Sequence, residues 1–394
     1  MRIGIDCRKI LNPEAGEVGG VAHYTHYLVR ELLKLDEKNE YILFFDNRIL
    51  STKPYEQKNV TIRQFPFYQY KRYLPIAYSH MLISAFITRE KLDLFHSPAT
   101  ILPYLYTGRS VITVHDFAIY EHADWFPSKY LSRQQLSTHM LVPRSVRAAE
   151  KIIAISEHTK KDLKKHFHVS ESRVHVIPLG VSRESVTPDA SAKTKAHFRL
   201  PEHFFLFLGT IEPRKNIEGL IAAFRVAFPK LKVAKTLVVA GGRGWKNESI
   251  FKAVAFANKA LEPWQGGHPP VRFLGPVTHE HKLALIAGAT AFVWPSLYEG
   301  FGLPVLEAMS LGAPVLTSNT TSLPEVVGDA ALLVNPNSER EIAEALVRLD
   351  HDEPLRMALR EKGREHSQQF SWKTTAEKTL EVYRKVAGNG TLDK

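Results

Sequence analysis

The sequence predicts an α/β protein with two doubly wound parallel-sheet domains. Short apolar runs alternate with segments whose apolar residues recur every three or four positions, which is typical of strands followed by helices. This alternation fills residues 1–182 and starts again at residue 196. A chain of 394 residues is also long enough for two domains of ordinary size.

The first half begins with the run RIGIDC, which predicts a buried strand. The helix after it is indicated by apolar residues that share one face: Val21, Tyr24, Leu28, Leu32 and Leu35. Further strands are expected at 41–45, 93–97, 111–115 and 151–156. Apolar runs of this kind are expected in a parallel sheet that helices cover on both faces. Residues 1–182 are therefore expected to form an N-terminal domain.

The second half follows a polar stretch at 183–195, which contains Pro188 and is expected to be a linker. The strands predicted for a C-terminal domain at 196–371 are 204–209, 236–241, 271–275, 291–295 and 313–317. Residues 372–394 are expected to form a C-terminal helix that packs back on the N-terminal domain, with a frayed tail. Open sheets of this kind bind ligands at the carboxyl ends of their strands, so we expect a site in a cleft between two facing domains.

The composition narrows the class of protein. Cys7 is the only cysteine, which excludes an internal disulfide and a cysteine-based zinc site. We find no secretory signal pattern and no apolar run of the roughly 18–20 residues that span a bilayer, so a cytoplasmic location is expected. Lys and Arg number 52 against 41 Asp and Glu, a net charge of +11. This excess favours an anionic partner, which could be a phosphorylated ligand, nucleic acid or anionic lipid.

Two loops carry the features of a phosphate site. Gly19 and Gly20 precede the first helix, where a backbone without side chains and a helix N-terminus can approach an anion. Arg214 and Lys215 lie in GTIEPRKN, directly after a predicted strand. A planar guanidinium beside a mobile ammonium suits a diphosphate, so this pair predicts a diphosphate site.

A third loop, at 295–315, carries two carboxylates. Glu299 precedes the predicted helix and Glu307 lies about one turn inside it. Carboxylates accept hydrogen bonds from hydroxyl groups, so a pair of them beside a helix start predicts a phosphorylated polyol, that is, a sugar nucleotide. A fourth loop holds His115 and Asp116 after the strand predicted at 111–115.

These motifs together resemble the retaining glycosyltransferases of family 4, which have the GT-B fold of two facing Rossmann-like domains. Glu299 and Glu307 give the E-x7-E spacing of that family. Within it, VHDF and DWFP are most similar to bacterial mannosyltransferases of polysaccharide assembly. The segments that carry the resemblance are PSLYEGFGLPVLEAMSLGAPV, GTIEPRKN, ISEHTKKDL, VHDF, DWFP and the Gly19-Gly20 loop.

The resemblance implies a role for each matching residue. The N-terminal domain would bind the acceptor, and the C-terminal domain the nucleotide sugar. The implied catalytic residues are His115, Arg214, Lys215 and Glu299. The implied donor-binding residues are Gly19, Gly20, Arg214, Lys215, Val277, Glu299, Gly300, Phe301, Gly302, Leu303 and Glu307.

Within that set, Arg214 and Lys215 would neutralise the diphosphate, with help from the Gly20 amide. Glu307 would bind the ribose, and Glu299 would hold the transferred sugar. His115 would lie by the sugar, with Asp116 orienting its loop. Backbone groups at 300–303 would assist Glu299, and those at Val277 would meet the nucleobase.

The resemblance further implies a reaction that needs neither metal nor cofactor. The expected enzyme is a hexosyltransferase that moves mannose from GDP-mannose to a growing glycan or a lipid-linked acceptor. None of the loops that carry these residues contains a DxD motif that would hold a divalent ion at the diphosphate. Preorganised cations aimed at the leaving group can supply that stabilisation.

Other functions remain open at this point. A UDP-sugar transferase or a sugar-nucleotide epimerase would fit the same fold. A retaining glycosidase also uses two carboxylates, but the diphosphate site argues for a nucleotide leaving group. Nucleic-acid binding would fit the charge, and Tyr68, Tyr70 and Tyr73 could stack bases. No RRM, KH or zinc-knuckle pattern occurs, however, and no nucleic-acid partner is expected.

The stretch 65–87 mixes aromatic residues, Lys71, Arg72 and an apolar run. Basic and aromatic amphipathic segments lie in the plane of anionic membranes, although an ordinary core helix would give a similar pattern. A lipid-linked acceptor would place the enzyme at the inner face of the cytoplasmic membrane. The sequence therefore predicts peripheral contact with an anionic membrane.

Overall fold

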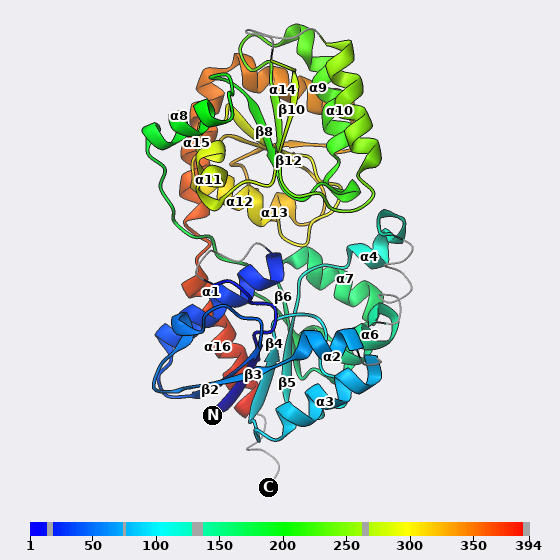
Figure 1. Ribbon diagram of the computed structural model, residues 1–394, viewed down its shortest axis with the longest axis vertical. Coiled ribbons are helices and arrows are strands. Elements are labelled where there is room, and N and C mark those ends of the chain that lie inside the picture. Colours follow the sequence, from blue (N-terminus) through cyan, green and yellow to red (C-terminus); the bar gives the residue numbers. More distant parts are fainter. Residues whose placement is uncertain (14–18, 74–75, 128–136, 262–267, 389–394) are drawn as a thin grey trace. The chain divides into compact units, whose positions relative to one another are not determined.

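The computed structural model (Figure 1) describes residues 1–13, 19–73, 76–127, 137–261 and 268–388. The chain divides into two compact units. Unit 1 comprises the described residues of Met1–Phe117, Lys129–Gly180 and Ser371–Lys394. Unit 2 comprises those of Ala118–Ser128 and Val181–Phe370.

Unit 1 is built on a seven-stranded sheet in the order β3-β2-β1-β4-β5-β6-β7, in which every neighbouring pair is parallel. The order reverses between β1 and β4, because the chain runs outward through β2 and β3 and then returns to the other side of β1. Its strands are β1 (Arg2–Asp6), β2 (Glu40–Asp46), β3 (Val60–Phe65), β4 (Leu94–Ser97), β5 (Ser110–Val114), β6 (Lys151–Ala154) and β7 (Val174–Val176).

The helices of unit 1 cover this sheet (Figure 1). They are α1 (Gly20–Leu35), α2 (Phe67–Tyr73), α3 (Ile76–Thr88), α6 (Val142–Ala148), α7 (Glu157–Phe167) and α16 (Trp372–Gly388). Helix α1 buries the apolar face that its spacing predicts, including Tyr24, Leu28 and Leu32. The C-terminal helix α16 packs against α1 and the strands of unit 1. Its Tyr383 hydroxyl lies 2.6 Å from Nδ1 of the buried His96 on β4.

Unit 2 repeats the same plan with a six-stranded parallel sheet in the order β10-β9-β8-β11-β12-β13. Its strands are β8 (Phe205–Leu208), β9 (Leu237–Ala240), β10 (Val271–Gly275), β11 (Ala291–Trp294), β12 (Val315–Ser318) and β13 (Leu332–Val334). Strands β9, β11 and β12 are buried throughout and β8 at all but its last residue, whereas Val271 is the one buried residue of β10. The buried apolar residues of these strands form one core with the helices that flank them. Here the order reverses between β8 and β11.

The helices of unit 2 follow its strands in alternation, as in a doubly wound fold. They are α4 (Ala118–Glu121), α8 (Pro188–His197), α9 (Ile217–Ala227), α10 (Glu248–Ala260), α11 (His279–Gly288), α12 (Leu303–Ser310), α13 (Leu323–Val327), α14 (Glu339–His351) and α15 (Glu353–Ser367). Within the described part of the chain, no helix combines the length and the apolar character that crossing a bilayer requires.

Two features differ from the sequence-based expectations. The stretch 183–195, expected as a linker, contains most of α8, which the Thr187 side chain caps by accepting a hydrogen bond from the Ala190 amide. The segment Ala118–Ser128, expected in the N-terminal domain, groups with unit 2. The Trp245 indole donates to the Trp125 carbonyl at 3.0 Å, and its ring stacks on Phe126 at 5.6 Å. These side-chain contacts, which no local pattern reveals, attach the segment to unit 2.

Candidate active site

The candidate site of unit 2 lies where the strand order reverses. Strands β8 and β11 are parallel neighbours, with Phe205 paired to Ala291. The loops that follow them, 209–216 and 295–302, therefore leave the same edge of the sheet and depart in opposite directions. They are joined directly, since the Leu297 amide donates to the Arg214 carbonyl at 2.8 Å. Ligands of open parallel sheets bind at such a reversal, outside the carboxyl ends of the strands.

Lys215 and Glu299 form a buried ion pair at this point. The Lys215 Nζ lies 2.5 Å from Glu299 Oε1, and only 7% and 8% of the two side chains are exposed. The indole of Trp294, the last residue of β11, donates to the same Glu299 Oε1 at 2.9 Å. The Lys215 ammonium also lies over the Trp294 ring, 4.7 Å from its centroid.

Arg214 extends this cluster to a second buried carboxylate. Its Nε donates to Oε1 of Glu212, a residue that is 2% exposed. Its Nη1 lies 3.5 Å from Glu299 Oε2. The two cations Arg214 and Lys215 are therefore matched by the two carboxylates Glu212 and Glu299, and the cations are held in place before a ligand arrives.

The electrostatics of the cluster follow from burial and from these neighbours. Burial by itself would raise the pKa of Glu299, but Lys215 and Arg214 outweigh it and hold the pKa below its ordinary value. Burial, reinforced by the charge of Arg214, lowers the pKa of Lys215, and the carboxylates of Glu299 and Glu212 offset this only in part. A dianionic diphosphate near Lys215 would favour its charged form, so ligand charge and site charge are complementary.

The loop that carries Glu299 is fixed by backbone hydrogen bonds. The Glu299 amide donates to Thr321 Oγ1 at 3.2 Å, and the Ser322 hydroxyl lies within 3.0 Å of the carbonyls of Glu299 and Phe301. Gly302 has φ +105°, which favours glycine, and begins α12 without a side-chain cap. Phe301 points into the core and packs on Phe370, with ring centroids 6.0 Å apart. In the first turn of α12, Pro304 has no amide hydrogen and the Val305 and Leu306 amides donate to the Gly302 carbonyl, so Leu303 is the residue of this turn whose amide can meet a ligand.

Glu307 lies on α12 and is engaged elsewhere. Its Oε2 lies 2.7 Å from Lys282 Nζ on α11, with both side chains partly exposed. Val277, partly buried against the core, lies in the loop between β10 and α11. In the next position the Thr278 side chain caps α11 by accepting from the His281 amide at 3.2 Å. Val277 thus follows β10, and Glu307 lies on the helix that follows β11.

The remaining predicted residues belong to unit 1. His115 directly follows β5, and its Nε2 lies 2.9 Å from the Pro98 carbonyl, an arrangement in which Nε2 carries the proton. Burial lowers the pKa of His115, and the Pro98 carbonyl and Asp116 offset it only partly. The ring meets Tyr24 edge-on at 5.0 Å. A neutral His115 therefore leaves Nδ1 as its acceptor.

Gly19 and Gly20 begin α1 and are exposed. A Cβ added at Gly20 would meet no atom within 4 Å, so the fold itself leaves room for a side chain there. The open space suits the close approach of a ligand to the backbone.

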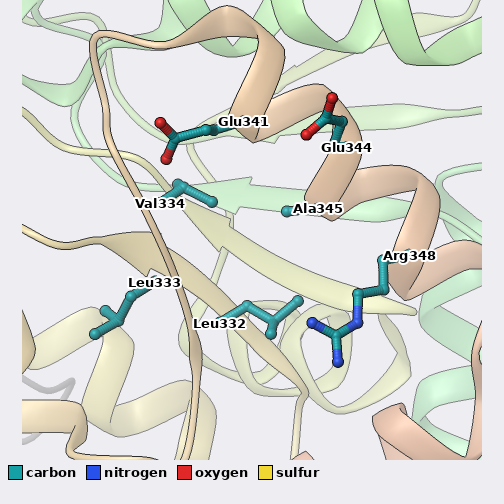
Figure 2. Close-up of a pocket in the computed structure, with 7 residues that line it drawn as sticks. All are labelled: Leu332, Leu333, Val334, Glu341, Glu344, Ala345 and Arg348. Atoms are coloured by element: carbon teal, nitrogen blue, oxygen red, sulfur yellow. The ribbon is translucent and has the colours of Figure 1, made fainter.

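A separate hollow on unit 2 contains none of the predicted site residues. Figure 2 shows this pocket of about 300 Å³ between β13 and α14. Its lining residues are Leu332, Leu333, Val334, Glu341, Glu344, Ala345 and Arg348. It offers mainly aliphatic and acidic side chains, so it does not suit a nucleoside diphosphate. Among the described residues, no group of three or more His, Cys, Asp or Glu is placed to hold a metal ion.

Sequence reasoning missed several residues of the cluster. Glu212 was part of the quoted GTIEPRKN motif but received no role. Trp294 reads in the sequence as an ordinary core residue at the end of a strand, and nothing local shows that its indole reaches Glu299. Thr321 and Ser322 follow a different strand, β12, and their contacts with the Glu299 loop depend on the order of strands in the sheet.

Two family models match the chain in succession. The model described as Glycosyltransferase Family 4 matches residues 18–185, and the model described as Glycosyl transferases group 1 matches residues 190–366. The O-antigen chain mannosyltransferase B of Escherichia coli is 31% identical over 377 residues, which cover 93% of this chain and 96% of that protein. The serotype-specific mannosyltransferase WbdA of Escherichia coli is 34% identical over 242 residues, 60% of this chain and 29% of that protein.

Solved structures show the same fold. Sucrose-phosphate synthase from Thermosynechococcus elongatus matches with a TM-score of 0.74 and 20% identity, covering 99% of this chain and 100% of that one. WaaG, a glycosyltransferase involved in lipopolysaccharide biosynthesis, matches with a TM-score of 0.69 and 17% identity, covering 96% and 99%. The fold expectation and the resemblance to bacterial mannosyltransferases are both confirmed: the chain is a glycosyltransferase enzyme of family 4 with the GT-B fold.

Proposed function

We propose that this enzyme is a retaining hexosyltransferase that moves mannose from GDP-mannose to a growing glycan or lipid-linked acceptor in cell-surface polysaccharide synthesis. The observation that carries the proposal is the buried cluster of Arg214, Lys215 and Glu299 at the reversal point of the unit 2 sheet. The mannosyltransferase names of the relatives in Escherichia coli support mannose as the transferred sugar.

The cluster suits the departure of a nucleoside diphosphate. In the transfer, the bond between the anomeric carbon and the diphosphate oxygen breaks, and its electron pair leaves with the diphosphate. The acceptor hydroxyl oxygen forms the new bond to that carbon, and its proton passes to the departing phosphate. Arg214 and Lys215, already oriented by Glu212 and Glu299, would stabilise the negative charge that develops. This role needs no divalent ion, so we propose a reaction without a metal or another cofactor.

The carboxylates would bind hydroxyl groups at two places. Glu299, fixed by Trp294 and Lys215, would hold the transferred sugar. Glu307, partly exposed on α12, would exchange Lys282 for the ribose hydroxyls. Neutral His115, with Nε2 committed to Pro98, would present Nδ1 to a hydroxyl of the sugar or acceptor. Gly20 and residues 300–303 would add backbone amides, and Val277 would adjoin the base.

The donor is tested first by binding. The midpoint of thermal unfolding is measured with GDP, UDP and ADP and with their sugar conjugates. A ligand at 100 times its Kd stabilises the folded state by about 2.7 kcal/mol, which such a measurement resolves. We expect GDP and GDP-mannose to stabilise most. A larger rise of the unfolding midpoint with UDP and UDP-sugars would mean that the donor is a UDP-sugar, with the reaction class unchanged.

The reaction is tested by product analysis. We expect GDP to be released only when a glycan acceptor is present, and the new linkage to keep the anomeric configuration of the donor, as measured by the one-bond carbon–proton coupling at C1. Conversion of the sugar nucleotide without an acceptor would support the epimerase alternative instead. An inverted product would refute retention.

We further propose that unit 1 contacts an anionic membrane. Helix α3 contains no charged residue, and its outward side chains Tyr78, Met81 and Leu82 are 60%, 47% and 41% exposed. A helix that is apolar on both its buried and its outward face favours a second apolar environment. Exposed Tyr104 and Leu105 adjoin it, because the Leu105 amide donates to Ser84 Oγ on α3 at 3.0 Å.

Cations border this apolar surface. The Arg144 guanidinium lies 4.8 Å from the centre of the Tyr104 ring, and Arg72 is exposed on α2, which packs on α3. The Lys71 side chain, which the sequence also suggested, lies outside the described part. Aromatic and aliphatic side chains bordered by arginine suit the interface of an anionic bilayer.

Flotation with vesicles tests the membrane proposal. We expect the enzyme to float with vesicles that contain phosphatidylglycerol, less with pure phosphatidylcholine, and less again at high salt. The double variant Met81→Glu, Leu82→Glu should lose flotation. Leu50→Glu, at another exposed leucine of unit 1, is the matched control and should keep it. Equal flotation of wild type and double variant, or none with either lipid, would overturn the proposal.

A further inference from the structure

Trp294 has a role in the site that its position at the end of a core strand does not suggest. It is 1% exposed, and its indole N–H is directed at Glu299 Oε1, 2.9 Å away. The ring face of the same indole lies under the Lys215 ammonium. Trp294 therefore contacts both members of the buried ion pair, through two different parts of one side chain.

The indole is held rigidly by its neighbours. Its ring stacks on Phe207 of β8, with centroids 4.8 Å apart and planes 7° apart, and lies near Phe292 at 5.8 Å. Gly209 leaves space for the outer edge of the ring, since an added Cβ there would come within 2.5 Å of it. A side chain packed in this way has lost its rotamer freedom on folding, so its N–H direction is set in advance.

Glu299 Oε1 thus has two donors of different kinds. Lys215 is a mobile cation, and the proposed function gives it a second partner in the diphosphate. As the ammonium turns toward phosphate, its hold on Glu299 weakens. The indole of Trp294 is uncharged and held by its stacked neighbours, so it stays in place when the ammonium moves. Oε2, which lies 3.5 Å from Arg214 Nη1, then remains to accept from a sugar hydroxyl.

We propose that Trp294 is a positioning residue that keeps the Glu299 carboxylate in place for the transferred sugar while Lys215 engages the diphosphate. This inference rests on the proposed function, because it assumes a sugar nucleotide as donor. It assigns the binding of the bare nucleotide to the two cations and Glu307, and the recognition of the attached sugar to Glu299 as held by the indole.

The test compares Trp294→Phe with Phe292→Leu. The first keeps an aromatic ring against Phe207 and Lys215 but removes the N–H donor. The second loosens the same core and keeps the donor. For Trp294→Phe we expect kcat to fall about 10- to 100-fold, the loss of one hydrogen bond to a charged group. The Kd of GDP should stay within about twofold of the wild-type value, because neither cation is lost.

In the same variant, the tighter binding of GDP-mannose relative to GDP should disappear. Phe292→Leu should lower the unfolding temperature while keeping both kcat and this preference near wild type. A Trp294→Phe enzyme with wild-type kcat and preference would overturn the inference, as would a parallel loss of GDP binding. If the wild type itself binds no nucleotide sugar, the proposed function fails. This failure is seen in the wild type alone, whereas failure of the Trp294 inference is seen only when the variant is compared with a wild type that binds the donor.

A measurement on the wild type covers the case in which the variant does not fold. The indole N–H resonance of Trp294, assigned by its shift in Glu299→Gln, reports the hydrogen bond directly. We expect it to keep its downfield position when GDP or GDP-mannose is added. A large upfield shift on donor binding would mean that the indole releases Glu299, which would also overturn the inference.

Discussion

Replacing Lys215 with methionine isolates the energetics of the buried pair. Methionine keeps the length and apolar stem of the side chain, so the change is mainly the loss of the ammonium that lies 2.5 Å from Glu299 Oε1. Since 8% of the Glu299 side chain is exposed, its charge would remain buried without a cation in close contact, beside the Trp294 N–H, the Ser296 hydroxyl and the more distant Arg214. Breaking one side of a buried pair costs about 3–5 kcal/mol. For a unit of this size that corresponds to roughly 6–20 °C in unfolding temperature.

The stability difference between wild type and Lys215→Met should depend on pH, in a direction that follows from the pKa of Glu299. In the wild type the pKa of Glu299 is held below its ordinary value of 4.5, so its stabilising contribution is present above that value and is lost as pH falls through the lowered pKa. Without Lys215, burial dominates and the pKa of Glu299 rises above its unfolded value. The variant then pays for the buried charge at neutral pH, and this cost shrinks as pH falls and the carboxyl takes up a proton.

The assay is thermal unfolding of wild type, Lys215→Met, Glu299→Gln and the double variant, at neutral pH and near pH 5. We expect the gap between wild type and Lys215→Met to be widest at neutral pH. The double variant should recover most of the lost stability but little transfer activity, because neither member of the Lys215–Glu299 pair is then charged and Arg214 alone remains to stabilise the leaving group. If Lys215→Met unfolds within about 1 °C of wild type at both pH values, the pair is not buried as described and the reasoning fails.

Three further outcomes are expected. Arg214→Ala should lower kcat by about 10²–10³, the effect of removing one preorganised donor, while EDTA leaves the wild-type rate unchanged; restoration of a lost rate by Mg²⁺ would contradict the second part. In calorimetric titrations with GDP, Glu307→Ala should weaken binding by about 1–3 kcal/mol, whereas Glu299→Ala should leave GDP binding intact. Glu299→Ala should instead reduce kcat/KM for transfer, and the opposite pattern would reverse the two roles. Because burial lowers the pKa of His115 below 6.5, its neutral form persists above that pH, and kcat/KM should fall only at lower pH. If kcat/KM of a His115→Gln enzyme falls at the same low pH, this histidine is not the cause of the fall.

The strands that the sequence predicted are those with continuous apolar runs, such as β8 and β11. Three strands at the sheet edges, β3, β7 and β13, were not predicted. β3 alternates polar and apolar residues, while β7 and β13 have three residues each, too few to show a pattern. Helix α8 was hidden by its polar composition, because a Thr187 cap and packing against α11 stabilise it rather than an apolar stripe of its own.

The charged residues of the site were recognisable because charge is unusual at the end of an apolar strand. Arg214, Lys215 and Glu299 all follow such strands, and the structure brings them into contact. The partners of these charges were not recognisable. Whether the Trp294 indole points into the core or toward Glu299 depends on side-chain packing between neighbouring strands. Sequence spacing carries no information about that direction, although the spacing does place Trp294 at the right strand end.

The C-terminal helix α16 has a consequence for how the protein is made. Most of unit 1 precedes unit 2 in the chain and is synthesised before it, yet the core of unit 1 includes Leu380, Tyr383 and Val386, which are synthesised after unit 2. Until then His96 lacks the Tyr383 hydroxyl, and apolar surface on α1 stays open to water. Most of unit 2 is continuous in the chain and can fold earlier, during synthesis. Unit 1, most of which is translated before unit 2, is therefore completed after it, and in the interval its exposed apolar surface favours aggregation.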